Sequence, residues 1–296
     1  MAELIYEIEN DFLKVKINSM GAELWSIINK KGEIEHLWQG DKAVWPRRSP
    51  ILFPYCGRVK DGKYKVDGKV YEGAVHGFAR DFEHEISNKT SDSIVFVFNS
   101  NEQTYARYPF EFRLYTEYKL QNKRLHCSFK VENCNDYEML FNIGYHTGFM
   151  CPFDNTTPIE NYSLVFEEKE TPVELVCNEE GLLSGEKRIA FENKDTIHLS
   201  KGLFESGSFV FSGLKSDYVS IAEKGTGRHV KVFIKDFPYV VFWSPPGEIK
   251  FVCIEPWFGL PDLCNAGGEL ANKFGIQRIN PNDVFSCTQT VEISSI

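Results

Sequence analysis

Residues 113–131 read RLYTEYKLQNKRLHCSFKV, and this stretch decides the fold class. Apolar and polar side chains alternate with a period of two over 113–120 and again over 125–131. This period is typical of a strand that buries one face and exposes the other. We therefore expect two consecutive β-strands here.

The same alternation recurs along the chain. Further strands are expected at 12–17, 94–98, 162–166, 219–222, 229–234 and 239–243. Turn signals lie at 29–32, 60–63, 66–69 and 224–227, where Asp-Gly pairs or glycines supply the positive φ that tight hairpins require. Consecutive strands are therefore expected to pair antiparallel.

Helices are expected to be single turns. No stretch of 12 or more residues carries an apolar stripe of period 3.6, and the nearest candidates lie near 49–53 and 268–273. Many strands without intervening helices, and no linker-like segment, predict an all-β protein in which residues 1–296 form one large antiparallel β-sandwich.

Composition excludes several classes of protein. The 296 residues are 42% hydrophobic, enough for an extensive core, and the formal charge of -9 does not suit a nucleic-acid partner. An acidic start and no run of 18 apolar residues predict a cytoplasmic protein without a membrane segment. The eight cysteines form no CxxC pair or zinc-ligand cluster, which predicts reduced thiols and no metal site.

Four segments interrupt the alternation with residue types that carry chemistry. They are residues 53–58, 75–80, 144–149 and 254–259. The sequence also lacks GxGxxG after a strand, GxxxxGK[ST], GxSxG and HExxH, so dinucleotide, P-loop, serine-esterase and zincin chemistries lose their usual support.

The candidate acid and base groups are two histidines and a glutamate. His76 and His146 stand beside glycines and aromatic residues, which suits either a histidine near a small ligand or a ring hydrogen-bonded within the core. Glu255 stands among apolar residues that should raise its pKa toward that of a working base. The alternative for Glu255 is a buried ion pair with an arginine such as Arg58, whose donors also suit sugar hydroxyls.

Aromatic and basic residues supply weaker candidates. Trp243, Trp257 and Phe258 could form an apolar platform for a pyranose ring, or they could simply be core. Arg47 and Arg48 could receive a phosphate or a further sugar unit, or they could lie in a solvated loop.

The order of these segments resembles the aldose 1-epimerase (galactose mutarotase) family, especially its LacX-like bacterial branch, over nearly the whole chain. Residues 57–71 followed by His76-Gly77-Phe78 are similar to the family's arginine, Asp-Gly turn and substrate histidine. Tyr145-His146 resembles its second histidine, residues 222–228 its Gly-Arg hairpin, and residues 254–257 the segment with its catalytic glutamate. The resemblance implies the galactose mutarotase-like supersandwich fold.

The resemblance also implies an activity, the interconversion of sugar anomers without metal or organic cofactor. Glu255 would be the general base and His146 the general acid, while His76 and Arg58 would bind substrate. Trp257 and Arg48 are expected to bind substrate on the strength of their residue types alone. A small-molecule sugar is the expected ligand, with no nucleic-acid or membrane partner, and a monomer or homodimer is expected. The sugar could be galactose, glucose, a disaccharide or a phosphorylated hexose, and a binding protein without catalysis is a further alternative.

One departure from the family concerns the sugar specificity. Its galactose enzymes carry a sugar-binding aspartate in a segment that aligns near residues 203–211. This chain has Glu205-Ser206-Gly207-Ser208 there.

Overall fold

The largest element of the structure is a nine-stranded sheet. The computed structural model describes residues 4–154 and 156–294. The order of strands in this sheet is β18 (Lys194–His198), β15 (Tyr162–Glu170), β20 (Tyr218–Glu223), β21 (His229–Phe233), β25 (Val284–Ile293), β11 (Arg124–Asn133), β10 (Phe112–Gln121), β9 (Ser93–Asn99) and β8 (Glu85–Lys89). Every neighbouring pair is antiparallel.

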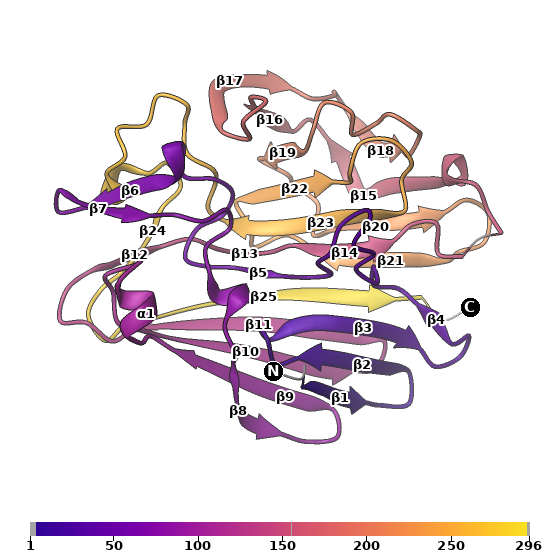
Figure 1. The fold of residues 1–296 in the computed structure, drawn as a ribbon. Helices are drawn as coiled ribbons and strands as arrows, with labels where there is room; N and C mark the ends of the chain where they lie inside the picture. Colours follow the sequence, from indigo (N-terminus) through magenta and orange to yellow (C-terminus); the bar gives the residue numbers. More distant parts are fainter. Residues whose placement is uncertain (1–3, 155, 295–296) are drawn as a thin grey trace.

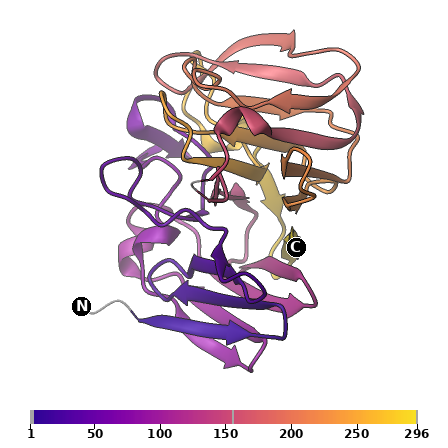
Figure 2. The ribbon, with the colours of Figure 1, turned by 90° about the vertical axis from the view of Figure 1, so that its right-hand side faces the viewer.

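Two other sheets cover the inner face of this one (Figures 1 and 2). The eight-stranded sheet runs β17 (Leu183–Ile189), β16 (Val173–Cys177), β19 (Phe209–Ser212), β22 (Tyr239–Trp243), β23 (Phe251–Phe258), β13 (Ile143–Tyr145) and β5 (Ile51–Leu52), with β14 (Thr147–Met150) also paired to β23. The four-stranded sheet runs β1 (Ile5–Glu9), β2 (Leu13–Asn18), β3 (Glu23–Asn29) and β4 (Ile34–Glu35).

Aromatic contacts join the layers. Phe166 of β15 meets Phe242 of β22 with ring centroids 5.9 Å apart, and Phe129 of β11 stacks on Tyr145 of β13 at 4.2 Å. Tyr6 of β1 packs against Phe96 of β9, in the nine-stranded sheet, with ring centroids 5.9 Å apart. Buried residues from most strands thus build one main core between the sheets, and two smaller apolar clusters lie beside it. Burial of large apolar side chains is the dominant favourable term in folding.

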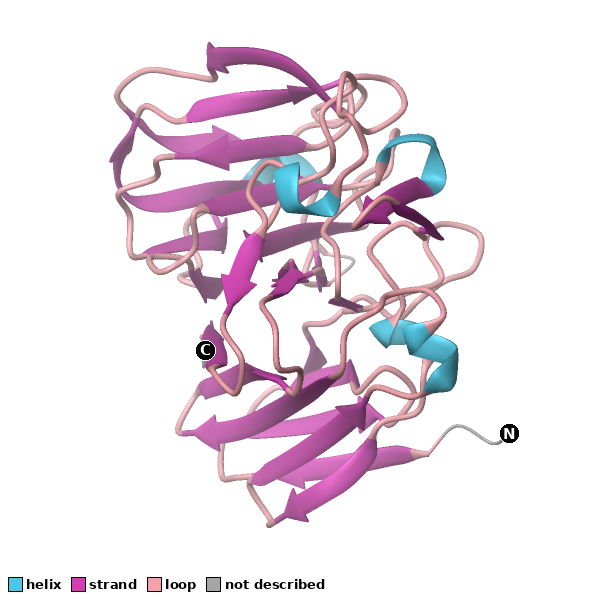
Figure 3. Ribbon diagram, turned by 90° about the vertical axis from the view of Figure 1, so that its left-hand side faces the viewer, coloured by secondary structure: helices cyan, strands magenta, loops and turns pink. Residues whose placement is uncertain are grey.

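The remaining elements are small. Two-stranded pairs form between β12 (Met139–Phe141) and β24 (Gln277–Ile279) and between β6 (Lys63–Val66) and β7 (Lys69–Glu72). The helical elements of the described residues are α1 (Glu102–Tyr105) and 3-10 turns at Lys60–Gly62, Ala79–Asp81, Ile159–Asn161 and Leu270–Asn272 (Figure 3). No helix in residues 4–154 or 156–294 is long and apolar enough to cross a membrane.

The predicted β-architecture is confirmed, and so are the eight strands expected from alternation. The Asp67-Gly68 turn joins β6 and β7 with φ values of 50° and 76°, as a two-residue hairpin loop requires. The helical candidate at 268–273 contains a 3-10 turn, but the one at 49–53 is wrong because Ile51–Leu52 is strand β5. This strand pairs with β13, and both of its apolar side chains are buried.

Candidate active site

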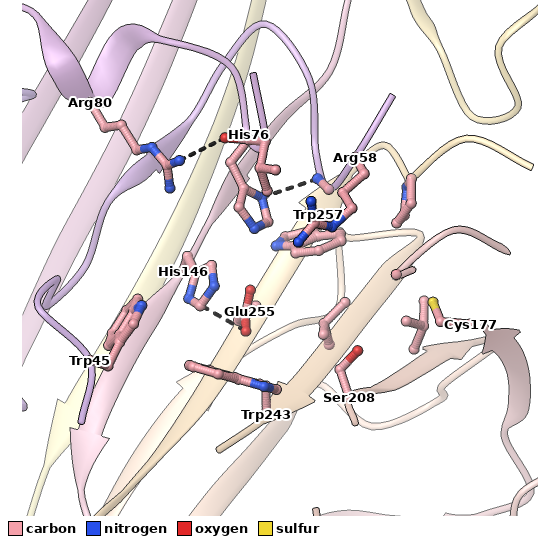
Figure 4. A pocket seen from close by; sticks show the side chains of 16 residues that line it. Trp45, Arg58, His76, Arg80, His146, Cys177, Ser208, Trp243, Glu255 and Trp257 are labelled. Carbon is pink, nitrogen blue, oxygen red and sulfur yellow. Dashed lines mark hydrogen bonds and ion pairs between the residues drawn. The ribbon is translucent and has the colours of Figure 1, made fainter. Parts of the chain in front are cut away.

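A cavity of about 400 Å³ opens beside β23, on the eight-stranded sheet (Figure 4). Its walls come from β22 and β23, the loops at 57–58 and 75–80, and the junction of β13 with β14. The residues that line it are Trp45, Gly57, Arg58, Val75, His76, Arg80, His146, Cys177, Gly181, Ser208, Val210, Val241, Trp243, Glu255, Trp257 and Pro261. Segments that are far apart in the sequence therefore line a single cavity.

Glu255 is the most deeply buried titratable group among the described residues that line this cavity. It is on β23 and only 1% exposed, and burial raises the pKa of its carboxyl well above its usual range. Its Oε2 atom is buried without a hydrogen-bond partner among the described residues, and its Oε1 atom lies 3.5 Å from Nδ1 of His146. The ion pair with Arg58 that the sequence left open is not among the ion pairs of the described residues; the neighbour of Glu255 is a histidine.

His146 is held between aromatic rings. It stacks on Trp45 at 4.9 Å and 25°, and it meets the edges of Trp243 and His76 at centroid distances of 5.7 and 5.2 Å. Burial, followed by the positive charge of Arg80, lowers the pKa of His146 to about 3. The ring is therefore neutral at pH 7 unless a neighbouring group or ligand stabilises its charge.

The tautomer of His76 is determined by the backbone. The N–H of Gly57 donates to Nδ1 of His76 at 3.0 Å, so Nδ1 is the acceptor and Nε2 carries the proton of the neutral ring. Burial lowers the pKa of His76 well below its usual range, and the nearby His146, Arg80 and Arg58 add to this effect. His76 therefore offers a fixed N–H donor.

The loop that carries His76 is held in an unusual conformation. His76 has a φ of 63° and Gly77 one of 72°, and a Cβ at position 77 would lie 2.1 Å from the carbonyl oxygen of Phe53. Only glycine fits such a close approach, which brings the His76 loop against the segment after β5.

Two arginines line the cavity. Arg58 is exposed and lies across Gly181, where a Cβ would be 3.3 Å from its Nε atom. Arg80 is half-buried; its Nη2 donates to the carbonyl oxygen of Val75 at 2.7 Å, and its Nε is buried without a hydrogen-bond partner among the described residues. Arg80 was missed in the sequence, although it ends the segment 75–80 that was singled out.

The adjacent arginine pair lies elsewhere. Arg47 pairs with Asp81 and lies 3.8 Å from Glu23. Arg48 donates to the carbonyl oxygen of Trp25 and to Oε1 of Gln39, both at 2.6 Å. The structure therefore does not bring Arg48, a predicted substrate-binding residue, among the residues that line the cavity.

Three tryptophans form the aromatic surface of the cavity. Trp243 and Trp257 line it as the sequence suggested, and Trp45, which was missed, covers His146. Phe258 instead packs on Phe237 and Phe285 in the core. The alternation of β23 explains the difference, because residues 255 and 257 share a face and residue 258 points the other way.

The segment aligned with the family's sugar-binding aspartate contributes a hydroxyl. Ser208 lines the cavity. Glu205 does not line it, and its carboxylate accepts a hydrogen bond from the backbone N–H of Gly247 at 2.9 Å. Glu255 is thus the one carboxylate among the described residues that line the cavity.

Comparisons with known proteins identify the family of the chain. The family model for aldose 1-epimerase matches residues 5–276. Protein LacX (chromosomal) of Lactococcus lactis subsp. lactis is 32% identical over 285 residues, covering 94% of this chain and 95% of that protein.

Solved structures show the same fold. A galactose mutarotase related enzyme from Lactobacillus acidophilus superimposes with a TM-score of 0.94 at 33% identity, covering 99% of this chain and 98% of that one. A galactose mutarotase-like protein from Lactobacillus casei ATCC 334 gives 0.91 at 28% identity, covering 98% and 100%. The fold is the galactose mutarotase-like β-sandwich, and the chain belongs to the aldose 1-epimerase family.

Proposed function

We propose that the protein is a mutarotase, an isomerase that interconverts the α and β anomers of an aldohexose such as galactose or glucose. The observation that carries the proposal is the buried pair of Glu255 Oε1 and His146 Nδ1, 3.5 Å apart and open to a cavity with aromatic walls. A base and an acid so close together can act on the two oxygens bonded to one anomeric carbon.

The pair handles one proton in each direction. The step begins from the charged form of the pair, in which the proton of Glu255 has passed to His146 and each charge is stabilised by the other across 3.5 Å. Glu255 takes the proton of the anomeric hydroxyl while His146 gives its proton to the ring oxygen, and the C1–O5 bond breaks to leave the open-chain aldehyde. Rotation about the C1–C2 bond and the reverse transfers then close the other anomer. After ring opening Glu255 is a neutral acid and His146 a neutral imidazole, the charge state that burial of both groups favours.

The surrounding donors position the sugar. The Nε2–H of His76 is oriented by the Gly57 bond and can donate to a sugar oxygen without any change of tautomer. Arg58 and Arg80 can donate to hydroxyls, and Trp45 and Trp243 can pack on the apolar face of a pyranose. Such fixed donors and surfaces lower the entropy cost of reaching the reactive geometry.

A second candidate is a mutarotase for phosphorylated hexoses. The sequence suggested Arg47 and Arg48 as the residues that would bind the phosphate, but neither lines the cavity. Two other arginines do, Arg58 and Arg80. Guanidinium groups bind phosphate well. Among the described residues that line the cavity, Glu255 is the one carboxylate that would repel a phosphate. The third possibility is a sugar-binding protein without catalysis.

Polarimetry of freshly dissolved α-glucose, α-galactose and glucose 6-phosphate tests these alternatives. We expect the wild type to exceed the spontaneous rate for at least one sugar, and Glu255→Gln and His146→Ala each to lose about 10²- to 10⁴-fold in rate. Glu205→Gln, which removes a carboxylate outside the cavity, is the matched control and should keep wild-type activity.

Each outcome selects one candidate. A preference for the phosphorylated sugar that disappears in Arg58→Gln and Arg80→Gln would favour the second candidate. A wild type that binds sugar but never exceeds the spontaneous rate would refute catalysis and favour the binding protein. Full activity of Glu255→Gln would refute the assignment of the base.

A further inference from the structure

We propose that His146, Cys253 and Glu255 form a binding site for one thiophilic divalent cation such as Zn²⁺, and that the bound cation blocks the cavity. This inference goes beyond the mutarotase proposal, because cation binding does not depend on catalysis of any reaction.

The three side chains already converge. One potential ligand atom from each lies within 4.8 Å of the other two. Cys253 and Glu255 are two positions apart on β23, so they share a face, and His146 directly precedes β14, whose Thr147 is registered opposite Ile254. One strand thus supplies two of the donors, and the junction between two strands supplies the third.

Two of these donors lack partners. Nδ1 of His146 and Oε2 of Glu255 are buried and make no hydrogen bond with the described residues, although the residues are only 8% and 1% exposed. Buried polar atoms without partners are uncommon and costly. A cation between them would satisfy both atoms.

The spacing fits tetrahedral coordination. Zinc bonds of about 2.0–2.3 Å to nitrogen, oxygen and sulfur place neighbouring ligand atoms roughly 3.4–3.6 Å apart. The distance of 3.5 Å between Nδ1 of His146 and Oε1 of Glu255 matches this. Since one ligand atom from each of the three residues lies within 4.8 Å of the other two, shifts of about 1 Å would complete the set. The fourth coordination position would face the cavity, where water or a sugar hydroxyl can reach it.

The donor types select the metal. One imidazole, one thiolate and one carboxylate suit zinc and similar ions, whereas magnesium and calcium prefer sets made only of oxygen donors. On binding, the cation replaces the protons of the Cys253 thiol and the Glu255 carboxyl, which pass to solvent. The two anionic ligands then balance its charge, and Glu255 and His146 are no longer available to a sugar.

Cobalt(II) is a direct probe of this site, because a tetrahedral ion with a thiolate ligand absorbs in both the near ultraviolet and the visible. We expect one equivalent of Co²⁺ to give both bands with the reduced wild-type protein, and Zn²⁺ to abolish them by displacement. Cys253→Ala should lose the near-ultraviolet band. Cys177→Ala, which removes the thiol that lines the cavity outside the proposed set of ligands, should keep it.

The outcomes are decisive for the site. His146→Gln is a second variant in case Cys253→Ala folds poorly, and it should lose the intense visible band. The proposal is overturned if the wild type gives no such bands, if they survive in Cys253→Ala, or if they vanish in Cys177→Ala. If the protein is a mutarotase, Zn²⁺ but not Mg²⁺ should inhibit it at least tenfold; a protein inactive on every sugar would refute the proposed function and leave the cobalt result unaffected.

Discussion

Two buried histidines outside the cavity are expected to make the protein sensitive to mild acid. His36 is 4% exposed, packs edge-on against Phe153, and has neither ring nitrogen hydrogen-bonded among the described residues. Burial, with a smaller effect from Arg228, lowers its pKa to about 4. His84 is stacked on Phe98 at 4.8 Å, and burial lowers its pKa to about 4 as well.

The sign and size of the effect follow from proton linkage. Between pH 6.5 and 4 the unfolded chain binds a proton at each histidine and the folded chain does not, so stability falls as the pH falls through this window. With an unfolded pKa near 6.5, each histidine should cost about 2 kcal/mol at pH 5 relative to neutral pH, and about 3 kcal/mol below pH 4. The raised pKa of Glu255 acts in the opposite direction, since it favours the folded state as pH falls.

Urea unfolding at pH 7.5 and pH 5 of the wild type and of His36→Phe isolates one histidine, because the contribution of Glu255 is common to both proteins. The variant should lose about 2 kcal/mol less than the wild type between the two pH values. His84→Phe should behave in the same way, and His198→Gln, which removes an exposed histidine, should match the wild type. Equal pH dependence in His36→Phe and the wild type would refute the argument from burial.

Two further predictions concern stability. Nζ of Lys273 lies 2.6 Å from Oδ1 of Asp262, and both side chains are buried. Lys273→Met should therefore lower the free energy of unfolding in urea by about 3–5 kcal/mol, because it leaves a buried carboxylate unpaired, and adding Asp262→Leu should recover part of this loss. An unchanged stability in Lys273→Met would contradict this prediction. Gly77→Ala should unfold at clearly lower urea than Gly185→Ala, because both positions have positive φ but only the Cβ at 77 would collide, with the Phe53 carbonyl. Equal midpoints would show that the close approach is relieved by a small shift.

Individual strands and turns could be predicted from the sequence, because the alternation of apolar and polar residues within one segment is enough to indicate a strand with one buried face. The run at 113–120 and the turn at 66–69 needed no other part of the chain to be recognised. Strand order was different. The neighbours of β25 are β11 and β21, and this pairing depends on which apolar faces pack together in three dimensions, which no local pattern records.

The candidate site divides in the same way. His76, His146 and Glu255 stood out because titratable groups in apolar or glycine-rich surroundings are unusual, and the structure brings them to one cavity with Arg58. Which other arginines line the cavity depends on the path of the loops in the folded protein.

The guanidinium of Arg48 is directed to Trp25, over whose ring it lies at 3.9 Å, whereas the loop at 75–80 turns Arg80 inward. Trp45 was not predicted for the same reason, because the sequence of a loop does not indicate which residue a tryptophan in it will contact.

The place of β25 in the nine-stranded sheet has a consequence for biosynthesis. During translation β21 and β11 are complete well before residues 284–293 leave the ribosome, yet β25 is the strand that joins them. Until it arrives, each presents an open edge, and unpaired strand edges are where nascent chains associate with one another. The interval before this strand is made is therefore when the chain most needs protection by chaperones.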